Sequence, residues 1–340
     1  MTTFKQNKNI AVVIPCYKVK QHILEVIGGL NPFIDIIVVV DDKCPENSGN
    51  FVEKNCNDPR VTVVYNQINK GVGGATIQGF KKALELGSDV IIKVDGDGQM
   101  NPEYIPQLIS PILNFEADYT KGNRFYFLNE LRAMPNIRLF GNSVLSMINK
   151  IVTGYWGIAD PTNGYTAISK EMLKLLPLEK IDNRYFFESD MLFRLSTSRA
   201  VVLDIPMHAK YGDEISNLNI WKTAFFFPFK YLIRFIKRIF YLYFLRDFNI
   251  GTIHLAFGLI LFIFGVVFGA TIWARSILYE NFASTGTVML SVLPIILGFQ
   301  LLLSFISYDI QNQPKVSIGK LTEKEHIIDP DKNPNTIKEK

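Results

Sequence analysis

Two uninterrupted apolar runs near the end of the chain restrict its fold more than any other feature. Residues 250–273 and residues 286–307 contain no Asp, Glu, Lys or Arg. Each run exceeds the roughly 20 residues that an α-helix needs to cross the hydrocarbon core of a bilayer. A buried helix of a soluble protein can be equally apolar, but seldom over this length and twice in succession. The sequence therefore predicts an integral membrane protein with a two-helix transmembrane hairpin over residues 250–308.

The cations that flank these runs indicate how the hairpin is oriented. Lys and Arg are frequent before the first run, and Lys315, Lys320 and Lys324 follow the second. The connector between the runs has one arginine, Arg275, balanced by Glu280. Because cytoplasmic flanks are enriched in Lys and Arg, both ends of the hairpin are expected in the cytoplasm. The polar start of the chain lacks the apolar core of a signal peptide, so the globular part is expected to be cytoplasmic too.

Residues 220–249, before the first run, combine many aromatic side chains with cations. Arg234, Lys237 and Arg238 recur at helical spacing, which places cations on one side of a helix and Phe or Leu on the other. This pattern is typical of a helix in the headgroup layer of a membrane, and an ordinary surface helix is the alternative. Pro228 is expected to divide the segment into two juxtamembrane helices.

The first two hundred residues alternate between two hydrophobic rhythms. Short β-branched runs end in polar or Gly-rich turns, and helical stretches lie between them. The β-branched runs occupy residues 10–17, 34–40, 60–65 and 89–94, and the helical stretches occupy residues 19–30, 73–86 and 102–113. This alternation predicts an α/β domain over residues 1–219, with a mostly parallel sheet covered by helices on both faces. Residues 309–340 are expected to form a polar cytoplasmic tail.

Polar residues follow several of the predicted strands. The residues at or just beyond the carboxyl ends are Pro15, Asp41, Asp42, Asp95 and Asp97. In open α/β sheets ligands bind outside these ends. These residues are therefore expected to share one site.

The strongest local signal is the run DGDGQ at residues 95–99, directly after the fourth strand. Two carboxylates two residues apart can share a hard divalent cation, which can bridge and neutralise a diphosphate. A calcium-binding EF-hand loop would need Gly at its sixth position and a carboxylate at its twelfth, where the chain has Met100 and Pro106. An EF-hand is therefore excluded, and a solvated acidic turn is the remaining alternative.

Two further segments indicate a phosphate-containing ligand. Asp41 and Asp42 end the second strand, where a carboxylate can accept hydrogen bonds from a base or ribose, or can cap a turn. Lys70 precedes a Gly-rich helix start at residues 71–74, whose N-terminus favours anions. Its ammonium could contact a phosphate or solvent. A dinucleotide-binding fingerprint is excluded, because Thr76 replaces the last Gly and the segment follows the third strand.

The overall composition argues against two other classes. Lys and Arg number 36 against 32 Asp and Glu, so bulk charge does not indicate a nucleic-acid partner. Cys16, Cys44 and Cys56 have neither CxxC spacing nor an even count, which argues against a disulfide framework and a zinc site.

The motifs follow one another in the order of a known family. Residues 13–17 (VIPCY), 40–42 (VDD), 69–71 (NKG) and 95–103 (DGDGQMNPE) resemble family-two glycosyltransferases. Within that family the chain is most similar to dolichyl- and polyprenyl-phosphate sugar transferases, and the two predicted spans match the membrane-anchored subgroup. The resemblance implies a GT-A fold, an inverting reaction and a divalent metal, either Mg²⁺ or Mn²⁺.

The resemblance also implies roles on the donor side. The residues that would hold the metal and the diphosphate are Asp95, Asp97 and Gln99. Those that would hold the base and ribose are Pro15, Tyr17, Asp41 and Asp42. Lys70 and Lys210 are further candidate phosphate contacts. Lys210 replaces an arginine of the family motif R-x-x-G-x-S, which keeps the charge but loses bidentate geometry.

Other matches concern the acceptor and the sugar. Residues 122–124 (GNR) match the family's G-S-R, whose arginine, here Arg124, meets the lipid phosphate. Arg138 lies where a second phosphate-binding arginine is expected, and Asn142 or Ser143 stands near the family's serine. The candidates beside the donor sugar are Asp160, Asn163, Glu188 and Asp190, the last two of which could equally be helix-surface carboxylates.

The expected reaction moves a hexose from a UDP- or GDP-linked donor onto undecaprenyl or dolichyl phosphate. The lipid phosphate is largely dianionic at pH 7, so it needs positioning at the anomeric carbon more than a general base. The residues expected to be catalytic are Asp97, Arg124 and Arg138. The expected partners are a nucleotide sugar, a polyprenyl phosphate and the membrane, and a homo-oligomer is left open.

Two alternatives belong to other classes of function. A hydroxyl-directed or processive transferase would need a base, for which Glu188 and Asp190 are the candidates. Processive synthases usually carry Q-x-x-R-W, which is absent from this sequence. A catalytically inactive membrane scaffold is disfavoured by the intact Asp95 and Asp97 pair and by both arginines.

Overall fold

The computed structural model describes residues 8–127, 131–132, 136–208 and 220–328. The chain forms two compact units. The sheet unit comprises Met1–Phe235 together with Pro314–Lys340, and the hairpin unit comprises Ile236–Gln313. The chain therefore leaves the sheet unit once and returns to it after the hairpin.

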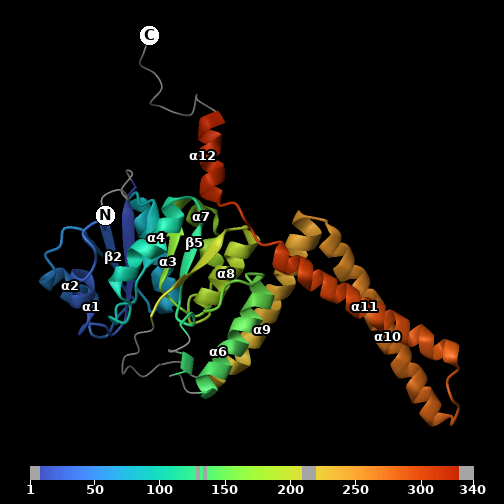
Figure 1. The fold of residues 1–340 in the computed structure, drawn as a ribbon. Helices are drawn as coiled ribbons and strands as arrows, with labels where there is room; N and C mark the ends of the chain where they lie inside the picture. Colours follow the sequence, from blue (N-terminus) through green and yellow to red (C-terminus); the bar gives the residue numbers. More distant parts are fainter. Residues whose placement is uncertain (1–7, 128–130, 133–135, 209–219, 329–340) are drawn as a thin grey trace. The chain divides into compact units, whose positions relative to one another are not determined.

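A seven-stranded sheet in the order β3-β2-β1-β4-β6-β5-β7 organises the sheet unit (Figure 1). The strands are β1 (Ile10–Cys16), β2 (Ile36–Asp41), β3 (Val61–Tyr65), β4 (Val90–Lys93), β5 (Tyr119–Asn123), β6 (Thr166–Ser169) and β7 (Val202–Pro206). β6 pairs antiparallel with β4 and β5, and the other pairs are parallel. The predicted mostly parallel sheet is confirmed. Because β6 is reversed, its first residues lie at the edge where the other strands end.

Alternate residues of the strands contribute to two hydrophobic cores, one on each face of the sheet. In β1, Val12 and Ile14 belong to the first core, and Ala11 and Val13 belong to the second. This division follows from the two-residue period of a strand. With both faces buried, the strands appear in the sequence as continuous apolar runs.

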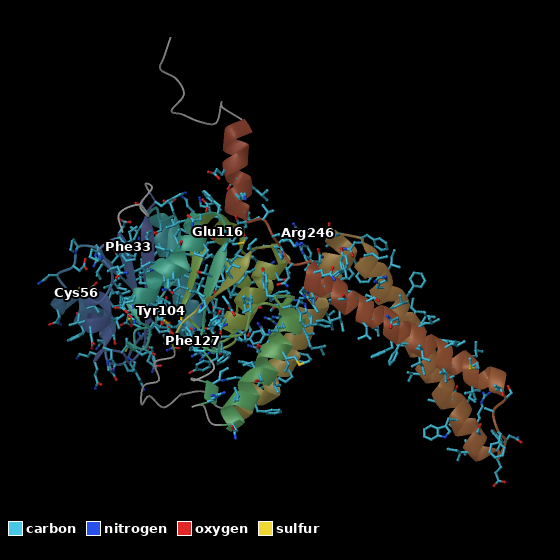
Figure 2. The ribbon with its side chains drawn as sticks, in the orientation of Figure 1. Phe33, Cys56, Tyr104, Glu116, Phe127 and Arg246 are labelled. Carbon is cyan, nitrogen blue, oxygen red and sulfur yellow. The ribbon has the colours of Figure 1, made fainter. Side chains whose placement is uncertain are left out.

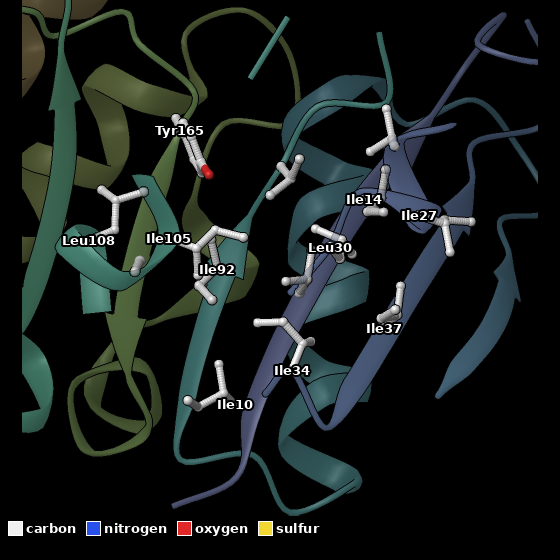
Figure 3. Close-up of a cluster of buried hydrophobic side chains, with 14 of the residues drawn as sticks. Ile10, Ile14, Ile27, Leu30, Ile34, Ile37, Ile92, Ile105, Leu108 and Tyr165 are labelled. Atoms are coloured by element: carbon white, nitrogen blue, oxygen red, sulfur yellow. The ribbon is translucent and has the colours of Figure 1, made fainter. Parts of the chain in front are cut away.

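Helices cover both faces of the sheet. The first core, shown in Figure 3, packs against α1 (Ile23–Gly28), α2 (Ser48–Asn55) and α4 (Ile105–Leu113). The second packs against α3 (Gly71–Glu85), α7 (Lys170–Leu175) and α8 (Phe187–Thr197). Short 3₁₀ turns occupy Pro102–Tyr104 and Leu178–Lys180.

Two longer helices, α6 (Asn136–Thr153) and α9 (Ile220–Ile239), meet around Phe186. The rings of Phe227 and Tyr231 lie 5.1 Å and 4.9 Å from the ring of Phe186. Lys230 pairs with Asp182. These contacts fix the middle of α9 to the loop before α8.

Helix α9 continues through Pro228, so the predicted division of this segment into two helices is wrong. A proline within a helix removes one backbone hydrogen bond. Here Phe227 and Tyr231, on either side of Pro228, pack on Phe186 and hold both adjoining turns.

The hairpin unit contains the two predicted spans as α10 (Ile250–Leu278) and α11 (Thr285–Gln311). Both helices are long and apolar enough to cross a membrane, with mean hydropathies of 2.6 and 2.3 over their most apolar stretches. Glycines let the two backbones approach closely, since a Cβ at Gly298 would lie 2.5 Å from the backbone N of Phe262. Before α10, a π-helical segment (Phe240–Arg246) carries Tyr243 into a buried cluster with Asp309 and Arg238.

The segment after the hairpin returns to the sheet unit as α12 (Ile318–Ile328). Asp118, a buried residue at the start of β5, accepts hydrogen bonds from the backbone N–H groups of Ile318 and Val201, both at 2.8 Å. Ser317 donates to the backbone carbonyl of Phe115. Residues 309–340 were expected to form a polar tail. Instead, residues 309–311 end α11, and α12 docks on the sheet unit through its first turn.

We expect Asp118→Ala to release the start of α12, because it leaves two N–H groups without their acceptor. Each unsatisfied buried donor costs about 1–3 kcal/mol. Hydrogen exchange of the amides of residues 318–322 should accelerate. Glu179→Ala, at an exposed surface ion pair, is the matched control and should leave this exchange unchanged. Unaltered protection in Asp118→Ala would contradict the docking role of Asp118.

Candidate active site at the carboxyl edge of the sheet

A cavity of about 410 Å³, here called the donor cavity, opens at the carboxyl ends of β1, β2 and β4. Its lining includes five residues singled out in the sequence, namely Pro15, Tyr17, Asp42, Asp95 and Asp97. The start of α3 and the loop before α8 complete the wall. The structure therefore brings these residues together at the edge where they were expected.

Asp42 fixes the start of α3 beside this cavity. Its Oδ1 accepts hydrogen bonds from Asn66 Nδ2 at 2.8 Å and from the N–H of Lys70 at 2.9 Å, and its Oδ2 accepts one from the N–H of Gly71 at 2.7 Å. Gly71 has a φ of +83°, which glycine adopts without strain. A Cβ at Gly71 would lie 2.7 Å from the carbonyl oxygen of Asn183. The glycine thus permits the loop before α8 to approach α3.

Asp41 and Lys70 have different surroundings from Asp42. Asp41 is buried, and its two oxygens accept the N–H groups of Cys44 and Gly49, each at 2.7 Å. This geometry favours the turn-capping interpretation for Asp41. The side chain of Lys70 is not among the described residues that line the donor cavity. The nucleotide contacts assigned to both residues stay predictions.

Asp95 and Asp97 lie between the donor cavity and a second cavity of about 140 Å³, here called the acceptor cavity, and line both. Gln99 also lines the acceptor cavity, and its backbone N–H donates to Asp97 Oδ1 at 3.0 Å. Within the described part of the chain, no three His, Cys, Asp or Glu side chains converge as a metal site. Carboxylate oxygens nevertheless suit Mg²⁺ and Mn²⁺. The residues fit a metal whose coordination diphosphate oxygens would complete.

A buried row of charges lies behind Asp95. Lys93, with 1% of its side chain exposed, places Nζ 2.7 Å from Asp95 Oδ1 and 3.9 Å from Glu188 Oε1. Burial alone would lower the pKa of Lys93, but the Asp95 and Glu188 carboxylates outweigh it and raise that pKa. Burial lowers the pKa of Lys121 to about 8 and raises the pKa of Glu188.

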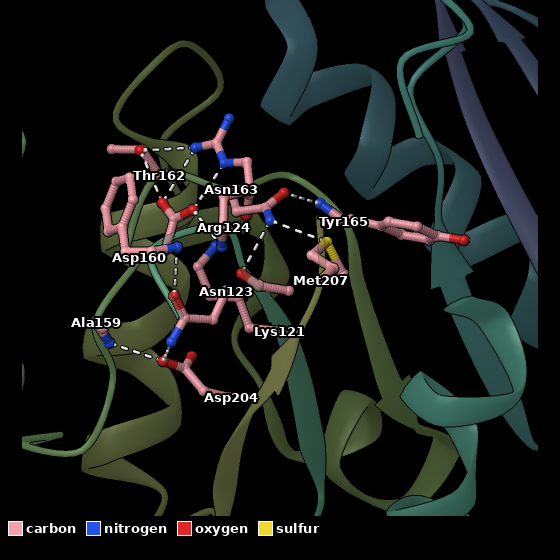
Figure 4. Close-up of polar contacts among 12 residues, drawn as sticks. Lys121, Asn123, Arg124, Ala159, Asp160, Thr162, Asn163, Tyr165, Asp204 and Met207 are labelled. Carbon is pink, nitrogen blue, oxygen red and sulfur yellow. Dashed lines mark hydrogen bonds and ion pairs between the residues drawn. The ribbon is translucent and has the colours of Figure 1, made fainter. Parts of the chain in front are cut away.

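On the acceptor side, Arg124 is held by Asp160 in a bidentate ion pair (Figure 4). Arg124 Nε lies 2.7 Å from Asp160 Oδ2, and Nη2 lies 3.1 Å from Oδ1. Asp160 is completely buried, and Arg124 lines the acceptor cavity. Asp160 therefore orients Arg124, and the position of Asp160 beside the donor sugar stays a prediction.

Asn163 joins the ends of β5 and β6. Its Nδ2 donates to the carbonyl of Gly122 at 2.9 Å, and its Oδ1 accepts from the N–H of Tyr165 at 3.0 Å. Lys121 donates to the carbonyl of Asn163 itself. Asn163 lines the acceptor cavity with Arg124. The antiparallel β6 makes this possible, since its amino end meets the carboxyl end of β5.

Tyr104, Tyr165 and His208 line the acceptor cavity, and Tyr104 and Phe127 are labelled in Figure 2. The ring of Phe127 stacks on that of His208 with centroids 4.1 Å apart. The hydroxyl of Tyr104 accepts the backbone N–H of His208 at 3.0 Å. These contacts connect the segment after β5 with the segment after β7.

Asp204, on β7, accepts hydrogen bonds from residues next to Arg124 and Asp160. Its Oδ2 accepts hydrogen bonds from Asn123 Nδ2 at 3.0 Å and from the N–H of Ala159 at 2.8 Å (Figure 4). Its Oδ1 is buried without a hydrogen-bond partner among the described residues. Burial raises the pKa of Asp204 to about 7, so the carboxyl is protonated below that pH in the folded protein.

We expect Asp204→Asn to stabilise the protein relative to the wild type as the pH rises from about 4 to 7. The unfolded chain ionises this carboxyl near pH 4, whereas the folded protein retains the proton to about pH 7. Because the folded state binds more protons in this window, the wild type loses stability as the pH rises. Asn resembles the protonated form and does not titrate.

The measurement is the difference in Tm between Asp204→Asn and the wild type at several pH values. Glu46→Gln, at an exposed carboxylate, is the control and should give a difference that does not change with pH. A constant difference for Asp204→Asn as well would show that Asp204 is ionised throughout.

A groove of about 360 Å³ extends along α6 and contains Asn142 and Ser143. Its other lining residues are Phe125, Leu131, Leu139, Ser146, Met147, Lys150 and Ala159. Phe125 and Ala159 directly adjoin Arg124 and Asp160 in the chain, so the groove begins next to that ion pair. Arg138 lies on α6, but its side chain is outside the described residues, as is Lys210.

Glu188 and Asp190 start α8 but face different partners. Glu188 faces Lys93, as described above. Asp190 is completely buried, with Oδ1 accepting from Arg234 Nε at 2.9 Å and Oδ2 from the N–H of Asp182 at 2.9 Å. Asp190 therefore attaches α9 to α8 and is not among the described residues lining either cavity.

Several residues at this edge were not anticipated from the sequence. Arg184 and Tyr185 line the donor cavity together with Pro15 and Tyr17, and no local motif marks them. Lys93 could have been recognised from the sequence. It lies in the apolar run that precedes DGDGQ, and a lysine in such a run is buried if the strand is central. A buried lysine in turn requires a carboxylate partner.

The sheet order and the helices that cover the sheet define a domain of the GT-A fold. Glucosyl-3-phosphoglycerate synthase from Mycobacterium tuberculosis, in a complex with Mn²⁺, UDP-glucose and phosphoglyceric acid, has a similar fold. The TM-score is 0.51 at 17% identity, over 69% of this chain and 81% of that one.

The chain belongs to glycosyl transferase family 2. The sequence model of that family matches residues 11–176. UDP-N-acetylglucosamine–dolichyl-phosphate N-acetylglucosaminyltransferase of Methanococcus voltae is 33% identical over 221 residues, which cover 61% of this chain and 88% of the relative. Undecaprenyl-phosphate mannosyltransferase of Micrococcus luteus is 29% identical over 58% of this chain and 82% of its own length. The resemblance drawn from the motifs is thereby confirmed.

Proposed function

We propose that this protein is a metal-dependent, inverting glycosyltransferase. It transfers a hexose from a UDP- or GDP-linked donor to a polyprenyl phosphate such as undecaprenyl or dolichyl phosphate. Relatives that act on polyprenyl phosphates with N-acetylglucosamine or mannose support this class of acceptor. They differ in the sugar, so the sugar of this enzyme is left to experiment.

The observation that carries the proposal is an apolar groove that starts beside Arg124 and continues onto an apolar helix face. Met147 lines the groove and is also 62% exposed. Phe140, Val144 and Ile151 are exposed on the same face of α6, at helical spacing. A polyprenyl chain needs such a path, and its phosphate would then lie near Arg124, Asn142 and Ser143.

Helix α9 adds a second apolar surface next to α6. Phe226, Phe229 and Leu232 are exposed on α9, whereas Phe227 and Tyr231 pack inward toward Phe186. Exposed aromatic stripes of this kind favour the interfacial layer of a membrane. Together with α10 and α11 they support an integral membrane protein with a lipid substrate.

In the proposed reaction an oxygen of the lipid phosphate attacks the anomeric carbon, and the bond from that carbon to the nucleotide diphosphate breaks. Arg124, oriented by Asp160, holds the acceptor phosphate and reduces its repulsion from the diphosphate. Arg138 is proposed for the same phosphate, and Lys210 and Lys70 for the donor phosphates. Asp95, Asp97 and Gln99 would hold a divalent metal, which neutralises charge on the diphosphate when bound.

The flanking cations support a catalytic domain in the cytoplasm, with the connector between α10 and α11 on the opposite side of the membrane. Both ends of the hairpin unit continue into the sheet unit. A hairpin with two spans is consistent with this connectivity, because it returns the chain to the side from which it came.

A hydroxyl-directed transferase has weaker support from the two candidate bases. Asp190 is engaged by Arg234 and the N–H of Asp182. Glu188 faces a buried lysine and has 14% of its side chain exposed. A phosphate acceptor, which needs no strong base, fits these surroundings better.

The test uses the full-length protein in detergent with undecaprenyl phosphate, Mg²⁺ or Mn²⁺, and a panel of UDP- and GDP-sugars. Mass spectrometry of the lipid fraction should detect one added sugar on the phosphate. A second panel offers hydroxyl acceptors with the same donors. Modification of a hydroxyl acceptor with no modification of the lipid would overturn the proposed acceptor. Absence of transfer from every donor would favour the inactive scaffold.

A further inference from the structure

Lys93 is a buried lysine that faces two carboxylates from different elements. Its Nζ lies 2.7 Å from Asp95 Oδ1 and 3.9 Å from Glu188 Oε1, and it donates to the carbonyl of Gly164 at 3.3 Å. Leaving a buried ammonium without an anion costs several kcal/mol. Lys93 therefore needs an anionic partner in every state of the site.

The proposed function creates a conflict at Asp95, and the inference rests on that function. A divalent cation at Asp95 would compete with Lys93 for the same carboxylate, and the two cations would repel each other. Glu188, at the start of α8, offers Lys93 a second anion at a distance that a small side-chain rotation can close. Lys121 is also buried and close enough to Glu188 to favour its charged form.

We propose that Lys93 is a positioning residue that moves between Asp95 and Glu188. It pairs with Asp95 when the donor cavity holds no metal, and it shifts toward Glu188 when a divalent cation binds Asp95. Glu188 thereby controls metal affinity without contacting the metal. The free protein binds the cation weakly, and the cation is held firmly once a nucleotide diphosphate supplies further oxygens.

The space around the pair supports this role. A Cβ at Gly164 would clash with Lys93 Nζ and would lie 3.0 Å from Asp95 Oδ2. The absence of a side chain at Gly164 leaves room for the Lys93 ammonium to move between Asp95 and Glu188. Lys93, on a central strand of the sheet, is otherwise fixed in its backbone by β1 and β6.

The test measures Mn²⁺ binding by electron paramagnetic resonance, with the full-length protein in detergent and with UDP, GDP or no nucleotide. The variants are Glu188→Gln, Lys93→Met and the double variant. Lys170→Met removes a lysine from a separate ion pair with Asp89 and is the matched control. UDP and GDP lack the donor hexose, so a contact between Glu188 and that hexose cannot affect the result.

We expect Glu188→Gln to weaken Mn²⁺ binding in the presence of nucleotide about tenfold, because Lys93 can no longer leave Asp95. Lys93→Met should tighten Mn²⁺ binding without nucleotide about tenfold, because it removes the competing charge. The double variant should bind Mn²⁺ as tightly as Lys93→Met, because Glu188 acts through Lys93 and its replacement has no further effect once that lysine is removed. Lys170→Met should match the wild type.

A purely structural role gives a different pattern. Both single variants would then lower the Tm, with equal or no effects on Mn²⁺ binding, and this result would overturn the inference. If Lys93→Met does not fold, Glu188→Gln decides alone, because unchanged Mn²⁺ affinity in a folded Glu188→Gln protein also overturns it. Absence of Mn²⁺ binding by the wild type with either nucleotide would instead overturn the proposed function, and the inference with it.

Discussion

Asp97→Asn is expected to reduce sugar transfer by about a thousandfold or more, since loss of one preorganised group that stabilises transition-state charge already costs about 10²–10³. Asp97 lines both the donor and the acceptor cavities, where the diphosphate and the acceptor phosphate would meet. The change keeps the shape of the side chain and removes one of the two carboxylates available to a metal. It should therefore lower kcat and weaken nucleotide binding in the presence of Mn²⁺.

The measurement is transfer to undecaprenyl phosphate with saturating donor and metal, together with titration of Mn²⁺ and nucleotide. Asp58→Asn is the control, because Asp58 pairs with Arg60 away from both cavities, and it should keep wild-type activity. An Asp97→Asn protein within a few-fold of the wild type would remove Asp97 from the metal site.

Local patterns in the sequence were sufficient for most of the sheet. The runs before Tyr17, Asp42 and DGDGQ became β1, β2 and β4, because parallel strands buried on both faces require continuous apolar residues. Strands β5 to β7 lacked this signal. Lys121 lies within β5, and Asp204 lies within β7. Neither strand is therefore a continuous apolar run in the sequence, although both belong to the sheet.

The reversed direction of β6 explains what sequence reasoning could not supply at the site. Asp160 and Asn163 precede β6, and their proximity to Arg124 depends on an antiparallel pairing between β5 and β6. The direction in which a strand pairs depends on the whole sheet, and it cannot be recognised from the four residues of β6. The ion pair between Asp160 and Arg124 could not be predicted for this reason.

The surroundings of Asp190 give a second example of the same limit. Its sequence neighbourhood, FESD, contains two carboxylates, and the sequence alone does not show which of them could act as a base. The structure separates them, because Asp190 turns toward Arg234 of α9 and Glu188 turns toward Lys93 of β4. Their partners lie 44 and 95 residues away in sequence, and only tertiary packing assigns them.

Arg124→Gln is expected to lower kcat/KM for the lipid acceptor by about 10²–10³, the loss typical of removing one group that stabilises charge in a transition state. Arg124 is the described arginine that lines the acceptor cavity. Its removal should leave the affinity for Mn²⁺ and nucleotide close to that of the wild type, because Arg124 is proposed to contact the acceptor phosphate and neither the metal nor the nucleotide. This separation of acceptor from donor effects is the first readout.

Arg124→Gln will also destabilise the fold, and the experiment has to separate this from catalysis. Asp160 is completely buried, and breaking a buried ion pair by removing one partner costs about 3–5 kcal/mol. The double variant Arg124→Gln/Asp160→Asn removes both charges and should recover much of the lost Tm. It should not recover transfer to the lipid. Recovery of activity together with Tm would mean that the ion pair serves the fold alone, and that another cation binds the acceptor phosphate.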